Sequence, residues 1–235
     1  MFIEGLKESH ISDYKLQNKI EKGSFAIPFK AIHIGSNRIC AIKRIDKSCL
    51  IASSDNPQQY DAQEVEVICR EIRISKKADH PLIVHFYEAF EDADYLYIVM
   101  EFIEGENMLN YVNSNGKLTE DQARYFFKQL ISCVEYLHNQ LHVTHRDLKA
   151  ENIIVDVHNN IRLIDFGLST DFGGGNDQKS NLMMNTVCGS PAYAAPELIQ
   201  GNEYSNSVDI WSCGVVLYSM VYASLPFYDE NMTKL

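Results

Sequence analysis

Two short motifs in the second half of the chain carry residues suited to moving a phosphoryl group. The first is His145-Arg146-Asp147-Leu148-Lys149-Ala150-Glu151-Asn152, and the second is Asp165-Phe166-Gly167. Phosphoryl transfer needs positioning and neutralisation of negative charge more than it needs covalent chemistry by the protein. Asp147 can accept or orient a hydroxyl proton, and Lys149 can lie beside the transferred phosphate. Asn152 and Asp165 supply hard oxygen ligands, which Mg²⁺ prefers.

The segment between the motifs predicts the element that brings them together. Residues 153–155 and 161–164 are apolar runs separated by a polar turn, which predicts a hairpin with Asn152 and Asp165 at neighbouring strand ends. Either motif alone arises easily as a charged turn. In this order and context, however, they closely resemble the catalytic core of protein kinases. The resemblance implies an α+β, bilobal protein-kinase fold, with a kinase N-lobe in residues 1–103 and a kinase C-lobe in residues 104–235.

The hydrophobic pattern predicts the elements of both lobes. Residues 14–46 alternate apolar and polar, which predicts a meander of strands, and residues 61–77 predict one helix. Strands are expected at 83–90 and 95–100, so the N-lobe is a small antiparallel sheet with one helix. From residue 108 the chain is mainly helical, and Thr119 with Gln122 predicts a capping box before a long amphipathic helix. The apolar run 215–222 predicts a core helix, with Trp211 in the core.

The kinase resemblance implies a nucleotide site in the N-lobe. Ala41-Ile42-Lys43 resembles the strand whose lysine reaches the ATP phosphates, and Glu71 is the matching carboxylate on the helix. Alone, such a lysine is usually a solvated strand-edge charge. Residues 100–103 resemble the hinge that reads the adenine edge, although any strand ending in a loop has this pattern. The expected nucleotide-binding residues are Gly23, Ala26, Pro28, Ala41, Lys43, Met100, Glu101, Ile103 and Ile154.

The glycine-rich loop departs from the family pattern. Glu21, Gly23, Ala26 and Pro28 stand at its key positions, so only the middle glycine is kept. A carboxylate roughly 4 Å from a phosphate costs about 1 kcal/mol in water and more when shielded. We therefore expect Glu21→Gly to tighten ATP binding, and an unchanged dissociation constant would contradict this interpretation.

Residues 186–197 strongly resemble the activation segment of calcium/calmodulin-dependent and AMP-activated kinases, which implies Ser/Thr specificity in protein substrates. Thr186 matches the threonine that an upstream activating kinase phosphorylates, and Arg146 can pair with its phosphate. An unmodified threonine in a polar loop is the alternative. Glu151 matches kinases that prefer basic residues before the target, whereas Asn107 replaces the glutamate that they usually carry.

Composition excludes several other classes of protein. The formal net charge of -11 and pI near 5.1 argue against nucleic acid and anionic membranes as partners and favour basic peptides. The six cysteines form no C-x-x-C pair, which favours a reducing interior. The acidic N-terminal residues lack the apolar run of a signal peptide. We therefore expect a cytoplasmic protein.

Two features leave an alternative function open. The chain ends at Leu235, before the last helices of a complete kinase domain, so apolar surface of the C-lobe is expected to need a covering partner. Ser75 replaces a large apolar residue that would stack on Phe166. The first expectation is an ATP- and Mg²⁺-dependent Ser/Thr protein kinase. The alternative is a kinase-fold pseudoenzyme or regulatory binding module with weak or no catalysis, and a small-molecule kinase is a distant third.

Overall fold

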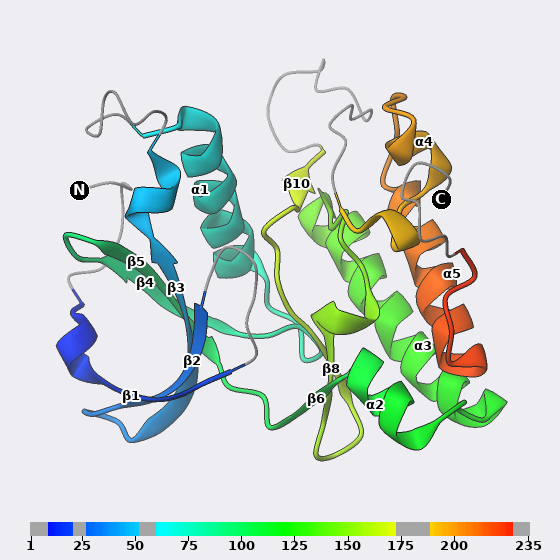
Figure 1. Ribbon diagram of the computed structural model, residues 1–235, viewed down its shortest axis with the longest axis horizontal. Coiled ribbons are helices and arrows are strands. Elements are labelled where there is room, and N and C mark those ends of the chain that lie inside the picture. The colour runs from blue at the N-terminus through cyan, green and yellow to red at the C-terminus, as the bar shows by residue number, and fades with distance from the viewer. Residues whose placement is uncertain (1–8, 21–26, 52–59, 173–188, 228–235) are drawn as a thin grey trace. The chain divides into compact units, whose positions relative to one another are not determined.

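The computed structural model describes residues 9–20, 27–51, 60–172 and 189–227 (Figure 1). The chain divides into two compact units. The first comprises residues 1–78 and 84–103, and the second comprises residues 79–83 and 104–235. Across the described ranges, no helix is both long and apolar enough to cross a membrane.

The first unit is a five-stranded antiparallel sheet with one long helix, as the sequence predicts. The strands follow the order β1-β2-β3-β5-β4. Helix α1 begins after Asp61, whose Oδ1 accepts the backbone N–H of Gln63 at 2.8 Å and thereby caps the helix. The elements are a 3₁₀ turn Ile11–Asp13, β1 Tyr14–Lys19, β2 Ile27–His33, β3 Arg38–Asp46, a 3₁₀ turn Lys47–Leu50, α1 Ala62–Lys77, β4 Phe86–Glu91 and β5 Tyr95–Glu101.

The two faces of this sheet bury different apolar clusters. Ile68 and Ile72 of α1 pack with Ile45, Leu96 and Ile98 on one face. The opposite face carries a second cluster, because side chains alternate along a strand. Its buried members are Tyr14, Ala31, Cys40, Ile42, Phe90, Tyr97 and Val99.

The predicted strand at 83–90 begins three residues too early. β4 starts at Phe86, and Ile83 instead bridges to Leu163 in the second unit. The backbone explains the difference, since Leu163 donates its N–H to the Leu82 carbonyl at 2.8 Å. Leu82 and Ile83 are therefore part of the second unit rather than of the sheet of the first.

The second unit is mainly helical and contains two small sheets, with strand orders β6-β8-β9 and β7-β10. The predicted capping box is confirmed, because Thr119 and Gln122 exchange hydrogen bonds at the start of α3. The elements are β6 Gly105–Asn107, α2 Met108–Asn115, α3 Glu120–Tyr136, a π turn Leu137–Leu141, β7 Val143–Thr144, a 3₁₀ turn Ala150–Asn152, β8 Ile153–Asp156, β9 Ile161–Leu163, β10 Thr170–Asp171, a 3₁₀ turn Pro191–Tyr193, α4 Pro196–Ile199 and α5 Ser207–Tyr222.

Helix α5 corrects one expectation about the core. Val208, Cys213 and Val216 are buried, but Trp211 is 38% exposed and stacks on Phe227, with ring centroids 5.6 Å apart. The helix is apolar on more than one side, and the described residues cover only part of its circumference. Trp211 lies on the uncovered part, so its placement in the core was wrong.

Candidate functional site

The carboxylate of Asp147 is held by three side chains. Asn152 donates its Nδ2 to Asp147 Oδ2 at 3.0 Å and to the Asp147 carbonyl at 2.9 Å. Lys149 Nζ lies 2.8 Å from the same Oδ2, and Ser190 Oγ donates to Oδ1 at 3.0 Å. The carboxylate is mostly buried, with 12% of the Asp147 side chain exposed. Its direction is therefore fixed, which a group that orients a reacting hydroxyl requires.

Ser190 is a contact that the sequence did not reveal. Its hydroxyl also accepts a hydrogen bond from Lys149 Nζ at 3.0 Å, so Ser190 joins the lysine to the aspartate. Gly189 makes this approach possible. Its φ is +92°, and a Cβ there would lie 2.5 Å from the Arg146 carbonyl.

The loop that carries Asp147 is anchored through its backbone by Asp209 of α5. Asp209 is fully buried, and its Oδ2 and Oδ1 accept the N–H groups of His145 and Arg146 at 2.8 and 2.9 Å. His138 Nε2 lies 2.8 Å from Oδ2. Arg146 has the left-handed φ of 67°, which is costly for a residue with a side chain, and the bonds of Asp209 to the His145 and Arg146 amides help to hold this turn.

The predicted hairpin does bring Asn152 and Asp165 to neighbouring strand ends. β8 and β9 pair in antiparallel register, and Ile164 donates its N–H to the Asn152 carbonyl at 2.9 Å. Asp165 is exposed with φ 66°, and its Oδ1 accepts the Gly167 N–H at 3.2 Å. Phe166 beside it is buried.

The donor atoms at this hairpin fit Mg²⁺. The amide nitrogen of Asn152 is directed at Asp147, so its oxygen is the atom presented to an ion. With the exposed Asp165 carboxylate this gives two hard oxygen donors, and Mg²⁺ commonly takes one or two protein ligands and completes its shell with waters and phosphates.

His145 lies against Phe166 in the interior of the second unit, with ring centroids 5.4 Å apart. Complete burial lowers the pKa of its imidazole, against the opposing influence of Asp209, Asp147 and Asp165. A neutral ring is therefore favoured at this position, and His145 serves packing rather than charge.

The first unit holds the second group of predicted residues. Lys43 Nζ of β3 lies 2.6 Å from Glu71 Oε1 of α1, and the two side chains are 22% and 7% exposed. Glu66, another carboxylate on α1, lies beside Arg70 and Arg73 instead.

The remaining nucleotide-binding candidates fall into three groups. In the first unit, Pro28 lies opposite Lys43 in the β2–β3 register, and Ala41 lies opposite Met100 in the β3–β5 register. Glu101 ends β5, and Ile103 follows it; both are half-buried. Ile154 lies on β8 of the second unit. Glu21, Gly23 and Ala26 lie outside the described residues.

The structure describes some of the residues predicted to serve regulation and substrate specificity. Arg146 donates its Nε to the Leu168 carbonyl at 2.7 Å and its Nη1 to the Tyr204 hydroxyl at 3.1 Å. Thr186 lies outside the described residues. Glu151 lies near the Tyr193 phenol, whose pKa is raised first by burial and then by the charge of this carboxylate. Asn107 caps α2, since its Oδ1 accepts the Asn110 N–H at 2.8 Å.

Comparison with known proteins agrees with this geometry. Residues 14–235 match the family model described as "Protein kinase domain". An SNF1-related protein kinase catalytic subunit alpha, KIN12, of Arabidopsis thaliana is 39% identical over 225 residues, covering 95% of this chain and 42% of that protein. The serine/threonine-protein kinase SIK1 of Mus musculus is 41% identical over 230 residues, covering 97% of this chain and 27% of that protein. The chain thus spans less than half the length of these curated relatives.

Proposed function

The chain belongs to the protein kinase family, and from that premise we propose that it transfers the γ-phosphoryl group of ATP to serine or threonine hydroxyls of protein substrates. The observation that carries the proposal is the Asp147 carboxylate, held at once by Asn152, Lys149 and Ser190. Both relatives described above are named as kinases, one of them as a serine/threonine kinase.

Each residue of the site has a chemical role in this proposal. Asp147 orients the substrate hydroxyl and takes its proton as the oxygen forms a bond to the γ-phosphorus and the bond to the ADP oxygen breaks. Lys149 neutralises the transferred group. Asn152 and Asp165 would hold Mg²⁺, which when bound neutralises phosphate charge. Lys43, oriented by Glu71, would neutralise the phosphates nearer the nucleoside.

The adenine would be held by backbone and apolar surface. We assign Met100, Glu101 and Ile103 to its edge, and Ala41, Pro28 and Ile154 to its faces. Gly23 and Ala26 complete the assignment from sequence alone.

We further propose that an upstream kinase activates the protein at Thr186. Arg146 supports this, because two of the five guanidinium N–H groups donate to Leu168 and Tyr204, and a phosphate would give the remaining charge a strong partner. If Thr186→Ala keeps the full kinase activity of the wild type, this proposed switch is contradicted.

Two further proposals concern substrates and location. The acidic Glu151 supports substrates with basic residues, and the absence of disulfides among the described cysteines supports a cytoplasmic location.

The first experiment is thermal unfolding of the chain with and without MgATP, in the wild type and in Asp165→Asn. A magnesium-dependent rise in Tm that the variant loses is expected. Phosphorylation of a basic Ser/Thr peptide, lost in Asp147→Asn, then tests the reaction itself. A cooperatively folded wild type that shows no shift with MgATP would contradict the proposal and favour a binding module without catalysis.

A further inference from the structure

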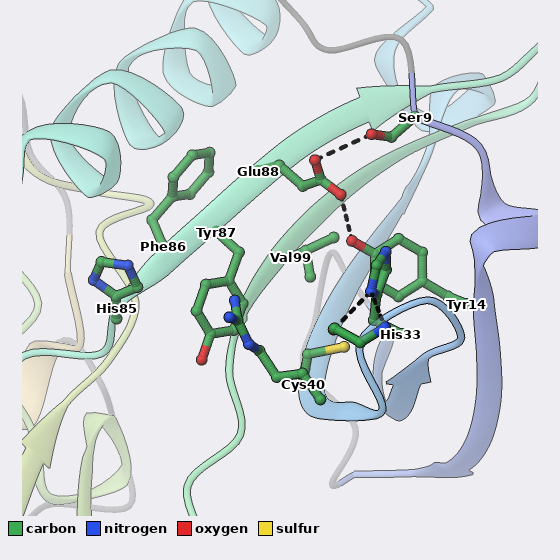
Figure 2. Close-up of a pocket in the computed structure, with 11 residues that line it drawn as sticks. Ser9, Tyr14, His33, Cys40, His85, Phe86, Tyr87, Glu88 and Val99 are labelled. Atoms are coloured by element: carbon green, nitrogen blue, oxygen red, sulfur yellow. Dashed lines mark hydrogen bonds between the residues drawn. The ribbon is translucent and has the colours of Figure 1, made fainter.

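A cavity of about 540 Å³ opens in the first unit, and none of the residues assigned above to phosphoryl transfer or nucleotide binding lines it (Figure 2). Its volume lies within the range of roughly 300–1,000 Å³ that is typical of small-molecule sites. Its walls come from β1, β2, β3, β4, β5 and the chain between β2 and β3. The residues that matter below are Tyr14, Arg38, Cys40, Tyr87, Glu88 and Val99.

Strand geometry separates this cavity from Lys43. Cys40 lines the cavity and lies three residues before Lys43 on β3, so the two side chains point to opposite faces of the sheet. Tyr14, Cys40 and Val99 belong to the apolar cluster on the face away from α1. The cavity is therefore a separate site from the one that pairs Lys43 with Glu71.

A bulge in β4 shapes the wall of the cavity. Phe86 lies opposite Met100 of β5, yet Glu88 lies opposite the adjacent Val99, so the bulged strand holds one extra residue, Tyr87. Bulges re-aim side chains and are common beside functional sites. Figure 2 shows the Tyr87 ring and the Glu88 carboxylate beside the same cavity.

The two charged side chains of the wall, Glu88 and Arg38, differ in their bonding. The Glu88 carboxylate accepts hydrogen bonds from the Tyr14 hydroxyl and, at 3.1 Å, from Ser9 Oγ (Figure 2). Arg38 is exposed and stacks over the Tyr87 ring at 4.6 Å, and among the described residues it forms no ion pair. The wall thus presents a cation beside aromatic rings, while its acid is already bonded.

The deeper wall is apolar and chemically inert. Cys40 is 1% exposed, and burial raises the pKa of its thiol to about 11, so the thiol stays neutral. Val99 is also 1% exposed. The floor of the cavity is therefore apolar and almost closed, and a ligand meets the more exposed residues above it.

We propose that this cavity binds a small aromatic carboxylate. The ring packs against the partly exposed His33 and Tyr87 side chains, above the buried Cys40 and Val99, and the carboxylate accepts the parallel N–H donors of the Arg38 guanidinium. Guanidinium and carboxylate match in bidentate geometry, which gives preference over a neutral aromatic of the same shape. The proposal is independent of kinase activity.

The test is a titration of the chain with 1-naphthoate, followed by NMR of the histidine ring signals. His33 and His85 line the cavity, whereas His158 lies on an exposed turn of the second unit. We expect the ring signals of His33 and His85 to shift while that of His158 does not. From the usual affinity per ligand atom, we expect a dissociation constant of about 1 mM. Unmoved signals at both residues would overturn the proposal.

Two comparisons test the role of charge. Arg38→Gln is expected to weaken 1-naphthoate binding at least tenfold, while Lys15→Gln, which removes an exposed charge from β1 outside the cavity, leaves it unchanged. On the wild type, the neutral probe 1-naphthalenemethanol is expected to bind about tenfold more weakly than 1-naphthoate. If the two probes bind the wild type equally well, or the two variants bind 1-naphthoate equally well, the proposed role of Arg38 is contradicted.

Discussion

Replacing Asp209 with asparagine tests how the catalytic loop is held. The carboxylate accepts the N–H groups of His145 and Arg146 and lies beside His138, all within 2.9 Å. The asparagine oxygen is expected to stay at the Oδ2 position, where two donors meet. Its NH₂ group then faces the Arg146 N–H. Both groups are donors, so no hydrogen bond forms between them.

The expected loss of stability follows from these bonds. Leaving a buried backbone donor unpaired costs about 1–3 kcal/mol, and turning the two remaining charge-assisted bonds into neutral ones costs about 1 kcal/mol more in total. Asp209→Asn should therefore lower the free energy of unfolding by about 2–4 kcal/mol. With an m-value of about 3 kcal/mol per molar urea, the midpoint falls by roughly 1 M.

The assay is urea unfolding followed by the fluorescence of Trp211, the one tryptophan of the chain, two residues from Asp209 on α5. Ser219→Ala is the matched control. Ser219 is buried on the same helix and donates to the Val216 carbonyl at 2.7 Å, and its loss should cost no more than about 1 kcal/mol. A midpoint for Asp209→Asn that is no lower than that of Ser219→Ala would refute the anchoring role.

Three other changes probe the site and its support. Glu71→Gln should lower kcat/KM for ATP about tenfold, because a charge-assisted bond worth about 1.5 kcal/mol is lost, whereas Glu64→Gln on the exposed side of α1 should leave it unchanged. Ser190→Ala should lower kcat about tenfold and Ser190→Thr should retain most of it; equal rates would mean that the hydroxyl does not position the aspartate. Burial lowers the pKa of His80, and its Nδ1 accepts the Leu82 N–H. Below pH 6.5 the unfolded chain therefore binds the proton more readily than the folded chain does, and stability falls as the pH drops. His80→Asn should narrow the difference between the urea midpoints measured at pH 7.0 and at pH 5.5.

The sequence predicted the parts of the site whose residue types are themselves the signal. Asp147 and Asn152 were found because only certain side chains can orient a hydroxyl or bind Mg²⁺, and the hairpin that brings Asn152 near Asp165 has a clear apolar pattern. The strands of the first unit followed from the alternation of apolar and polar residues, and its helix from the apolar residues within 61–77. The catalytic roles assigned to Asp147 and Asn152 stay predictions until the assays above are made.

The features that sequence did not reveal depend on contacts between distant segments. Ser190 reaches Asp147 only because Gly189 adopts a positive φ against the Arg146 carbonyl, and a serine in a polar loop carries no sign of this. Ile83 looked like part of a strand, since a short apolar run does not show which partner it pairs with. Trp211 was placed in the core because an apolar helix does not show which of its sides the rest of the chain covers.

Strand β3 carries two different environments three residues apart. Cys40 faces the cavity on one side of the sheet, and Lys43 faces Glu71 on the other. A single backbone segment, paired with β2 and β5 along its length, connects the two side chains. Two ligands, one in the cavity and one at Lys43, are therefore coupled when the affinity of each depends on the position of β3, and thermodynamic linkage requires the two effects to be equal in size. Measuring either affinity with the other site saturated would give this coupling free energy directly.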